Sequence, residues 1–91
     1  MFVIQSFANK DAKMFFEGKR VPRFTQIRDA LTRKLTVLDE ADDLRDLAAT
    51  PGNRLEQLHN GVYSIRVNVQ MRIVFRWTAE GPADVKVEDY H

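Results

Sequence analysis

The sequence contains no cysteine among its 91 residues. This absence excludes disulfide bonds and thiolate metal sites as sources of stability, and it fits a protein kept in a reducing compartment. No segment approaches the roughly 18 consecutive apolar residues that a membrane-spanning helix needs. The first residues also lack the basic region, apolar run and small-residue cleavage site of a signal peptide. We therefore expect a cytoplasmic protein that does not engage a membrane.

Histidine is scarce, and the common catalytic motifs are missing. The chain has two histidines, His59 and His91, and neither has the spacing of a metal ligand. There is no P-loop, no GxGxxG fingerprint, no HExxH motif and no nucleophile elbow. We expect no metal ion and no cofactor, so any catalysis has to use ordinary side chains.

Charge is nearly balanced overall but is distributed unevenly along the chain. The formal net charge is +1. Residues 10–34 hold eight Lys or Arg against three acids, whereas residues 35–50 hold five acids against one Arg. This arrangement indicates either two surfaces with different tasks or two solvated helix faces. A length of 91 residues suits one small core, so residues 1–91 are predicted to form a single domain.

The first half of the chain predicts one strand followed by helices. Residues 1–7 form a short apolar run that indicates a first strand, and Asn9 is a suitable N-cap for the helix after it. Apolar residues recur at helical spacing over residues 24–40, which predicts the longest helix. Lys34 is the only charged residue on its apolar stripe and is expected to extend its ammonium group toward water. A short helix over residues 42–49 follows.

The strongest pattern lies at residues 63–77, where apolar and polar residues alternate in two runs. β-Branched and aromatic residues dominate the apolar positions, which predicts two antiparallel strands with one buried face. A three-residue loop at residues 68–70 keeps the apolar side chains of both strands on that face. In this register Arg66 lies directly opposite Arg72.

A further strand is predicted on each side of this pair. Residues 54–58 alternate before a turn at residues 59–61, and residues 83–87 alternate after a turn at Gly81-Pro82. The order of elements predicts an α+β fold, with two or three N-terminal helices packed on one face of a mostly antiparallel, roughly five-stranded sheet. The opposite face is expected to stay open and to carry three arginines: Arg66, Arg72 and Arg76.

The opposed arginines need an explanation, because like charges directly across a sheet destabilise it. Either a carboxylate compensates them, with Glu56, Glu88 and Asp89 as candidates, or they bind an anion. Guanidinium groups are well suited to neutralise the charge that develops on a phosphate during phosphoryl transfer. RNA brings its own nucleophile, the ribose 2′-OH, so such a protein needs to hold the phosphate and supply a proton to the leaving oxygen.

The end of the chain offers groups that can carry that proton. An imidazole such as that of His91 exchanges a proton near neutral pH. A histidine at a C-terminus is also commonly just a frayed chain end. Strand parity puts Tyr90, rather than His91, in phase with Lys86 on the arginine face if the last strand continues that far.

The segments IRVN (65–68), RIVFRW (72–77) and the closing DYH (89–91), read with PGNRLEQL (51–58), resemble the HigB-type toxins of the RelE/ParE superfamily. These toxins are the growth-inhibiting halves of bacterial toxin–antitoxin pairs. The resemblance covers nearly the whole chain, and the spacing of its parts is specific in combination. One departure is Met71, which stands where this subfamily usually has tryptophan.

The resemblance implies a RelE-like fold and a ribosome-dependent, metal-independent endoribonuclease that cuts translated mRNA by attack of the 2′-OH on the scissile phosphate. It implies three partners, which are the ribosome, mRNA and a helix-turn-helix antitoxin of the HigA type, and it implies that operator DNA is bound only through that antitoxin. The alternative is a non-catalytic toxin that binds a protein target such as DNA gyrase, as ParE-type relatives do.

The resemblance gives the catalytic residues, together with Arg54 and His59, by position, whereas the charge pattern and the arginine face give the other RNA-binding residues. Arg72 matches the arginine that stabilises the phosphate, Arg66 has a structural or catalytic role, and the terminal DYH serves proton transfer. The expected catalytic residues are thus Arg66, Arg72, Asp89, Tyr90 and His91. The expected RNA-binding residues combine the basic helical segment with positions near the arginine strands: Arg20, Arg23, Arg28, Arg54, His59 and Arg76.

Overall fold

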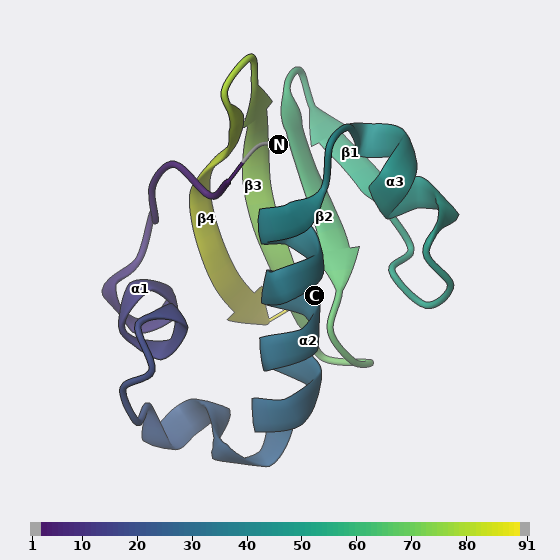
Figure 1. Cartoon of the computed structure of the whole chain (residues 1–91). Coiled ribbons are helices and arrows are strands. Elements are labelled where there is room, and N and C mark those ends of the chain that lie inside the picture. Colours follow the sequence, from purple (N-terminus) through teal and green to yellow (C-terminus); the bar gives the residue numbers. More distant parts are fainter. Residues whose placement is uncertain (1–2, 90–91) are drawn as a thin grey trace.

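The computed structural model describes residues 3–89. In this part of the chain helices come first and a four-stranded sheet follows, which confirms the α+β class (Figure 1). The sheet is antiparallel, in the order β1-β2-β3-β4. The elements are α1 (Lys10–Phe16), the 3-10 helix η1 (Pro22–Ile27), α2 (Arg28–Glu40), α3 (Leu44–Ala49), β1 (Glu56–His59), β2 (Val62–Arg66), β3 (Met71–Thr78) and β4 (Gly81–Asp89).

The strand expected over residues 1–7 is reduced to a single parallel bridge between Phe7 and Val85, and residues 1 and 2 lie outside the described part. The sheet therefore has one strand fewer than expected among residues 3–89. Three main-chain hydrogen bonds still join residues 5–8 to β4, whereas the main-chain N–H of Ile4 donates to the carboxylate of Asp39 at 2.8 Å. Because that donor serves a helix side chain, it cannot join a ladder with β4.

Two of the helix starts follow local capping chemistry. The side chain of Asn9 accepts a hydrogen bond from the Ala12 N–H at 3.1 Å, so the expected cap of α1 is confirmed. The short helix expected over residues 42–49 begins at Leu44, because Asp43 is its N-cap and forms a reciprocal capping box with Asp46. These two acids of the acidic stretch thus have a structural role.

The long helix begins later than the hydrophobic pattern indicated. Residues 22–27 form η1, in which the Phe24 N–H donates to the Val21 carbonyl at 2.9 Å. The α-helical pattern starts only at Arg28 and ends at Glu40. A proline at the start of η1 suits a tight first turn, because it has no N–H to satisfy there. No helix within residues 3–89 is long and apolar enough to span a bilayer.

The predicted register of β2 and β3 is confirmed. Ile65 pairs with Ile73, and Arg66 pairs with Arg72. The Asn68 side chain closes the three-residue loop, since its Oδ1 accepts the main-chain N–H groups of residues 70 and 71 at 2.8 Å each. This local bonding explains why the loop has three residues, and it sets the alignment of both strands.

The outer strands differ from the sequence prediction in their limits. β1 starts at Glu56 rather than at residue 54, and the left-handed backbone of Arg54 (φ 47°) interrupts the extended conformation there. Gly81-Pro82 is not a turn but the start of β4, where Gly81 pairs with Thr78. The turn lies at residues 79–80, two positions earlier than predicted. Asp84 (φ 51°) marks an irregularity that puts Ala83 opposite Arg76.

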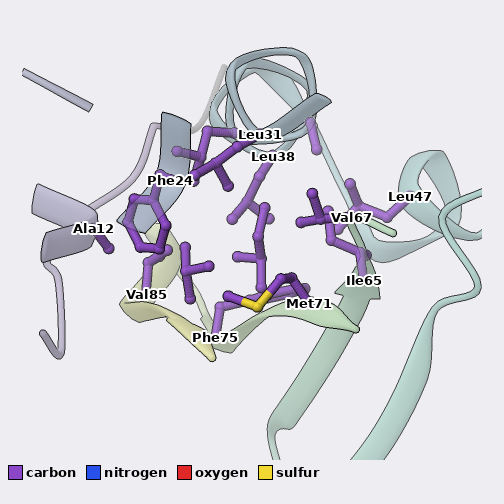
Figure 2. Close-up of a cluster of buried hydrophobic side chains, with 14 of the residues drawn as sticks. Ala12, Phe24, Leu31, Leu38, Leu47, Ile65, Val67, Met71, Phe75 and Val85 are labelled. Carbon is purple, nitrogen blue, oxygen red and sulfur yellow. The ribbon is translucent and has the colours of Figure 1, made fainter. Parts of the chain in front are cut away.

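The helices cover one face of the sheet, and the core lies between the two layers (Figure 2). Leu31 and Leu38 of α2 point toward Phe75 and Val85 of the sheet, and all four side chains are fully buried. Burial of a side chain of this size contributes about 1.5–3 kcal/mol relative to exposure. Met71 is also part of this cluster, with 8% of its surface exposed, so it packs in the core.

Candidate functional site

Arg72 is almost completely buried, with 7% of its surface exposed, which corrects the expectation that it lies on an open face. Its Nε donates to Ser64 Oγ at 2.8 Å, and its Nη2 donates to the main-chain carbonyls of Arg54 at 2.6 Å and Ser64 at 3.4 Å. These three acceptors are neutral oxygens. The contacts therefore fix the direction of the guanidinium.

Arg66 lies opposite Arg72 at the end of β2 and is half-buried. Its Nε donates to the Asn68 carbonyl at 3.2 Å, and its main-chain N–H donates to the Asn53 carbonyl. Within residues 3–89 no carboxylate forms an ion pair with Arg66. Glu88, one of the expected compensating acids, pairs instead with Lys86 at 3.4 Å.

A pocket of about 400 Å³ lies in this region, and we call it the arginine pocket. Its cationic lining comes from Arg54, Arg66 and Arg72, against one acid, Glu56. An excess of fixed positive charge in a recess favours an anion, because low-dielectric walls weaken the screening by water. The remaining lining residues are Leu55, Asn68 and Val69.

Of the three residues expected to transfer protons, the structure describes only Asp89. Asp89 ends β4 and is exposed. It pairs with the buried Met71, so its side chain has the phase of the core face rather than that of Arg72. Tyr90 and His91 lie outside the described residues. The structure therefore tests neither of them.

His59 and Arg76 belong to a different part of the sheet. Together they line a hollow of about 280 Å³ that shares no lining residue with the arginine pocket. Arg76 forms an ion pair with Asp84 at 3.3 Å. The structure thus separates these two expected RNA-binding residues from Arg54, the third one near the sheet.

The other expected RNA-binding residues lie in the helical layer. Arg20 and Arg28 line a hollow of about 530 Å³ whose floor includes Phe24. Arg23 is engaged within the protein, because its Nε contacts the Asp11 carboxylate at 2.6 Å and its guanidinium stacks over Phe24 at 4.4 Å. Arg28 also pairs with Asp29, but at 3.7 Å and with both side chains largely exposed, so Arg20 and Arg28 are better placed than Arg23 to bind a polyanion.

The sequence interpretation missed the residues that hold the arginines in place. Ser64 is fully buried between Arg72 and β1, and Asn53 is fully buried beneath the turn before β1. The position of Ser64, a serine inside a strand that pairs with the Arg72 strand, is only a weak indication that it binds an arginine. No local pattern marks Asn53 as a buried hydrogen-bonding residue, because turns commonly contain asparagine.

Comparison with known proteins gives a consistent result. A family model described as "RelE-like toxin of type II toxin-antitoxin system HigB" matches residues 5–91. Toxin HigB-1 of Vibrio cholerae serotype O1 (strain ATCC 39315 / El Tor Inaba N16961) is 42% identical over 76 residues, which cover 78% of this chain and 80% of that protein. An uncharacterized protein of Haemophilus influenzae (strain ATCC 51907 / DSM 11121 / KW20 / Rd) is 40% identical over 50 residues, or 52% of this chain and 50% of that protein.

Proposed function

This chain belongs to the family of RelE-like HigB toxins of type II toxin–antitoxin systems, and we propose that it is a ribosome-dependent endoribonuclease that cuts translated mRNA without a metal ion. Membership of a type II system implies an antitoxin partner. We assign to that partner the HigA-type helix-turn-helix fold and the binding of operator DNA. The proposed site of action is the cytoplasm, where translation takes place.

The observation that carries the proposal is the way Arg72 is held. Its guanidinium is buried and oriented by a hydroxyl and two carbonyls, and Arg66 stands directly opposite. Positive groups fixed before the reaction stabilise developing negative charge without reorganisation, and loss of one such group commonly lowers a rate by about 10²–10³-fold. A scissile phosphate in the arginine pocket would meet this arrangement.

In the proposed reaction the ribose 2′-OH of the RNA attacks the neighbouring phosphorus. The new O–P bond forms a cyclic phosphate as the bond to the 5′-oxygen of the next nucleotide breaks. The 2′-OH loses a proton and the 5′-oxygen gains one, so the step is balanced without any further reactant. We assign the phosphate to Arg72, Arg66 and Arg54, and the proton transfer to the terminal residues Asp89, Tyr90 and His91.

Binding to the ribosome is assigned to the helical layer. The exposed guanidinium groups of Arg20 and Arg28 suit contacts with ribosomal RNA phosphates, with a smaller contribution from Arg23. His59 and Arg76 are assigned to the flanking RNA strand, away from the scissile phosphate. Phosphate contacts of this kind make binding strongly dependent on salt.

The test is to express the wild-type chain, Arg72→Ala and His91→Ala in bacteria and to map the 5′ ends of cellular mRNA. Wild-type protein is expected to produce new 5′ ends within translated messages, and both variants are expected to lose them while circular dichroism shows them folded. Absence of new ends with the wild-type protein would end the nuclease proposal. Inhibition of purified DNA gyrase without RNA cleavage would favour the non-catalytic alternative.

A further inference from the structure

Lys34 and Asn53 form a buried polar pair between α2 and the turn that precedes β1. The Lys34 ammonium donates to Asn53 Oδ1, and the exposed fractions of the two residues are 7% and 0%. Asn53 Nδ2 donates to the Leu47 carbonyl of α3 at 3.0 Å. Both ends of the Asn53 amide are therefore anchored to helices, and the main chain of this turn has a fixed position.

The same turn holds both arginines of the site. The Asn53 carbonyl accepts the main-chain N–H of Arg66, and the next carbonyl, that of Arg54, accepts Arg72 Nη2 at 2.6 Å. The backbone of Arg54 is left-handed at this point, with φ 47°. Few L-residues adopt this conformation unless surrounding contacts enforce it.

We propose that Lys34 and Asn53 are positioning residues, which set the geometry of the Arg66–Arg72 pair through the turn at residues 53–54. The inference rests on the proposed nuclease function, because it assigns to these residues an effect on phosphate chemistry. Neither residue needs to touch RNA. They act through the Arg54 carbonyl and the Arg66 main chain, and a displacement of about 1 Å at a reacting group can lower a rate by about 10²-fold.

A purely structural role is the competing explanation. A buried lysine is a weak source of stability, because removing its charge from water offsets most of the gain from its hydrogen bond. Burial and the neighbouring charge of Arg33 both lower the pKa of Lys34, which agrees with an ammonium group that is poorly solvated. Because of this unfavourable desolvation free energy, Lys34 is expected to contribute more to the geometry of the turn than to the stability of the fold.

The experiment compares two neutral replacements and one core control. Lys34→Gln keeps an N–H donor near Asn53, whereas Lys34→Met has a similar size and no donor. Leu38→Val lies one turn further along α2 and removes a methylene from the core, so it lowers stability without touching the turn. Single-turnover cleavage of mRNA on purified ribosomes is measured at a temperature where circular dichroism shows every protein folded.

We expect Lys34→Met to lower the cleavage rate roughly tenfold to a hundredfold with little change in ribosome affinity. Lys34→Gln should retain more of the rate, although both variants lack the charge, and Leu38→Val should cleave like the wild type. A second readout needs no RNA. The rate of solvent exchange of the Arg72 Nε–H is measured by NMR. In Lys34→Met this exchange should be faster than in the wild type by at least the factor by which cleavage slows, and in Leu38→Val it should be unchanged.

The outcomes separate the two proposals. If the wild type does not cleave RNA but Lys34→Met loosens the Arg72 Nε–H, the nuclease assignment fails and the positioning role stands. If the wild type cleaves and the two lysine variants match Leu38→Val in both rate and exchange, the positioning role is wrong. Equal losses in Lys34→Gln and Lys34→Met, with Arg72 exchange unchanged, would also overturn it, because charge alone would then explain the rates.

Discussion

Arg66 and Arg72 occupy directly opposed positions on β2 and β3, and different neutral oxygens hold their two guanidinium groups. Arg66 donates to the Asn68 carbonyl, whereas Arg72 donates to Ser64 and to the Arg54 carbonyl. Like charges opposite each other in a sheet are unfavourable. An anion bound beside these two cations would be attracted to both, so ligand binding and stability are expected to be linked at the arginine pocket.

Inorganic phosphate is therefore expected to raise the melting temperature of the protein. A ligand that binds only the folded state adds about 2.7 kcal/mol at a concentration one hundred times its dissociation constant. Thermal unfolding is measured at constant ionic strength with phosphate or with chloride. A similar gain from both anions would contradict a specific site.

Arg66→Gln should remove most of this phosphate effect and should not destabilise the protein without phosphate. Loss of an opposed like charge is expected to raise the free energy of unfolding by about 0.2–1 kcal/mol. Urea unfolding of both proteins in low-phosphate buffer gives this difference in the free energy of unfolding. A decrease of more than about 1 kcal/mol would mean that Arg66 is mainly a structural residue.

Arg72→Lys should abolish most of the cleavage activity although the charge is kept. Lysine cannot reproduce the fork of contacts that the guanidinium makes with Ser64 and Arg54, so the cation would lose its fixed position. We expect a decrease of about 10²–10³-fold in the single-turnover rate. The matched control is Arg45→Lys on α3, where the side chain is 93% exposed, and its rate should equal that of the wild type. An active Arg72→Lys protein would show that charge without orientation is sufficient.

The basic residues of the helical layer should differ in their effect on ribosome binding. Replacement of Arg20 or Arg28 by Gln is expected to make the plot of log affinity against log salt shallower, by about 0.7–0.9 for each phosphate that the variant no longer neutralises. Arg23→Gln should have a smaller effect, because Asp11 already compensates that charge at 2.6 Å. Sedimentation with purified ribosomes over a salt series gives the slopes. Equal slopes for the three variants would show that the ion pair with Asp11 does not matter.

The stability of the protein should rise with pH in the alkaline range because of Lys34. Burial lowers the pKa of Lys34 in the folded state below its ordinary value of 10.5, while the unfolded chain keeps that value. Between the lowered pKa and 10.5 the unfolded state binds more protons, so the free energy of unfolding increases with pH in this window. Urea unfolding of the wild type and Lys34→Met is compared over that range, because titration of the other groups is common to both. Parallel pH profiles would show that the pKa of Lys34 is the same in the folded and unfolded states, which would contradict this prediction.

Local sequence alone determined the elements whose partners lie nearby in the chain. Alternation over residues 63–77 fixed the opposition of Arg66 and Arg72, since a shift by one residue would turn every apolar side chain toward water. The cap at Asn9 depended on a bond to a residue three positions away, and it was equally predictable.

Only the tertiary structure decided how the arginines are used. Burial of Arg72, its bond to the Arg54 carbonyl eighteen positions away and the contact between Lys34 and Asn53 all join distant segments. The separation of Arg76 from the arginine pocket has the same origin. A periodic pattern specifies which face of an element is apolar, but the packing of several elements specifies which polar groups meet, and that depends on contacts that no local pattern records.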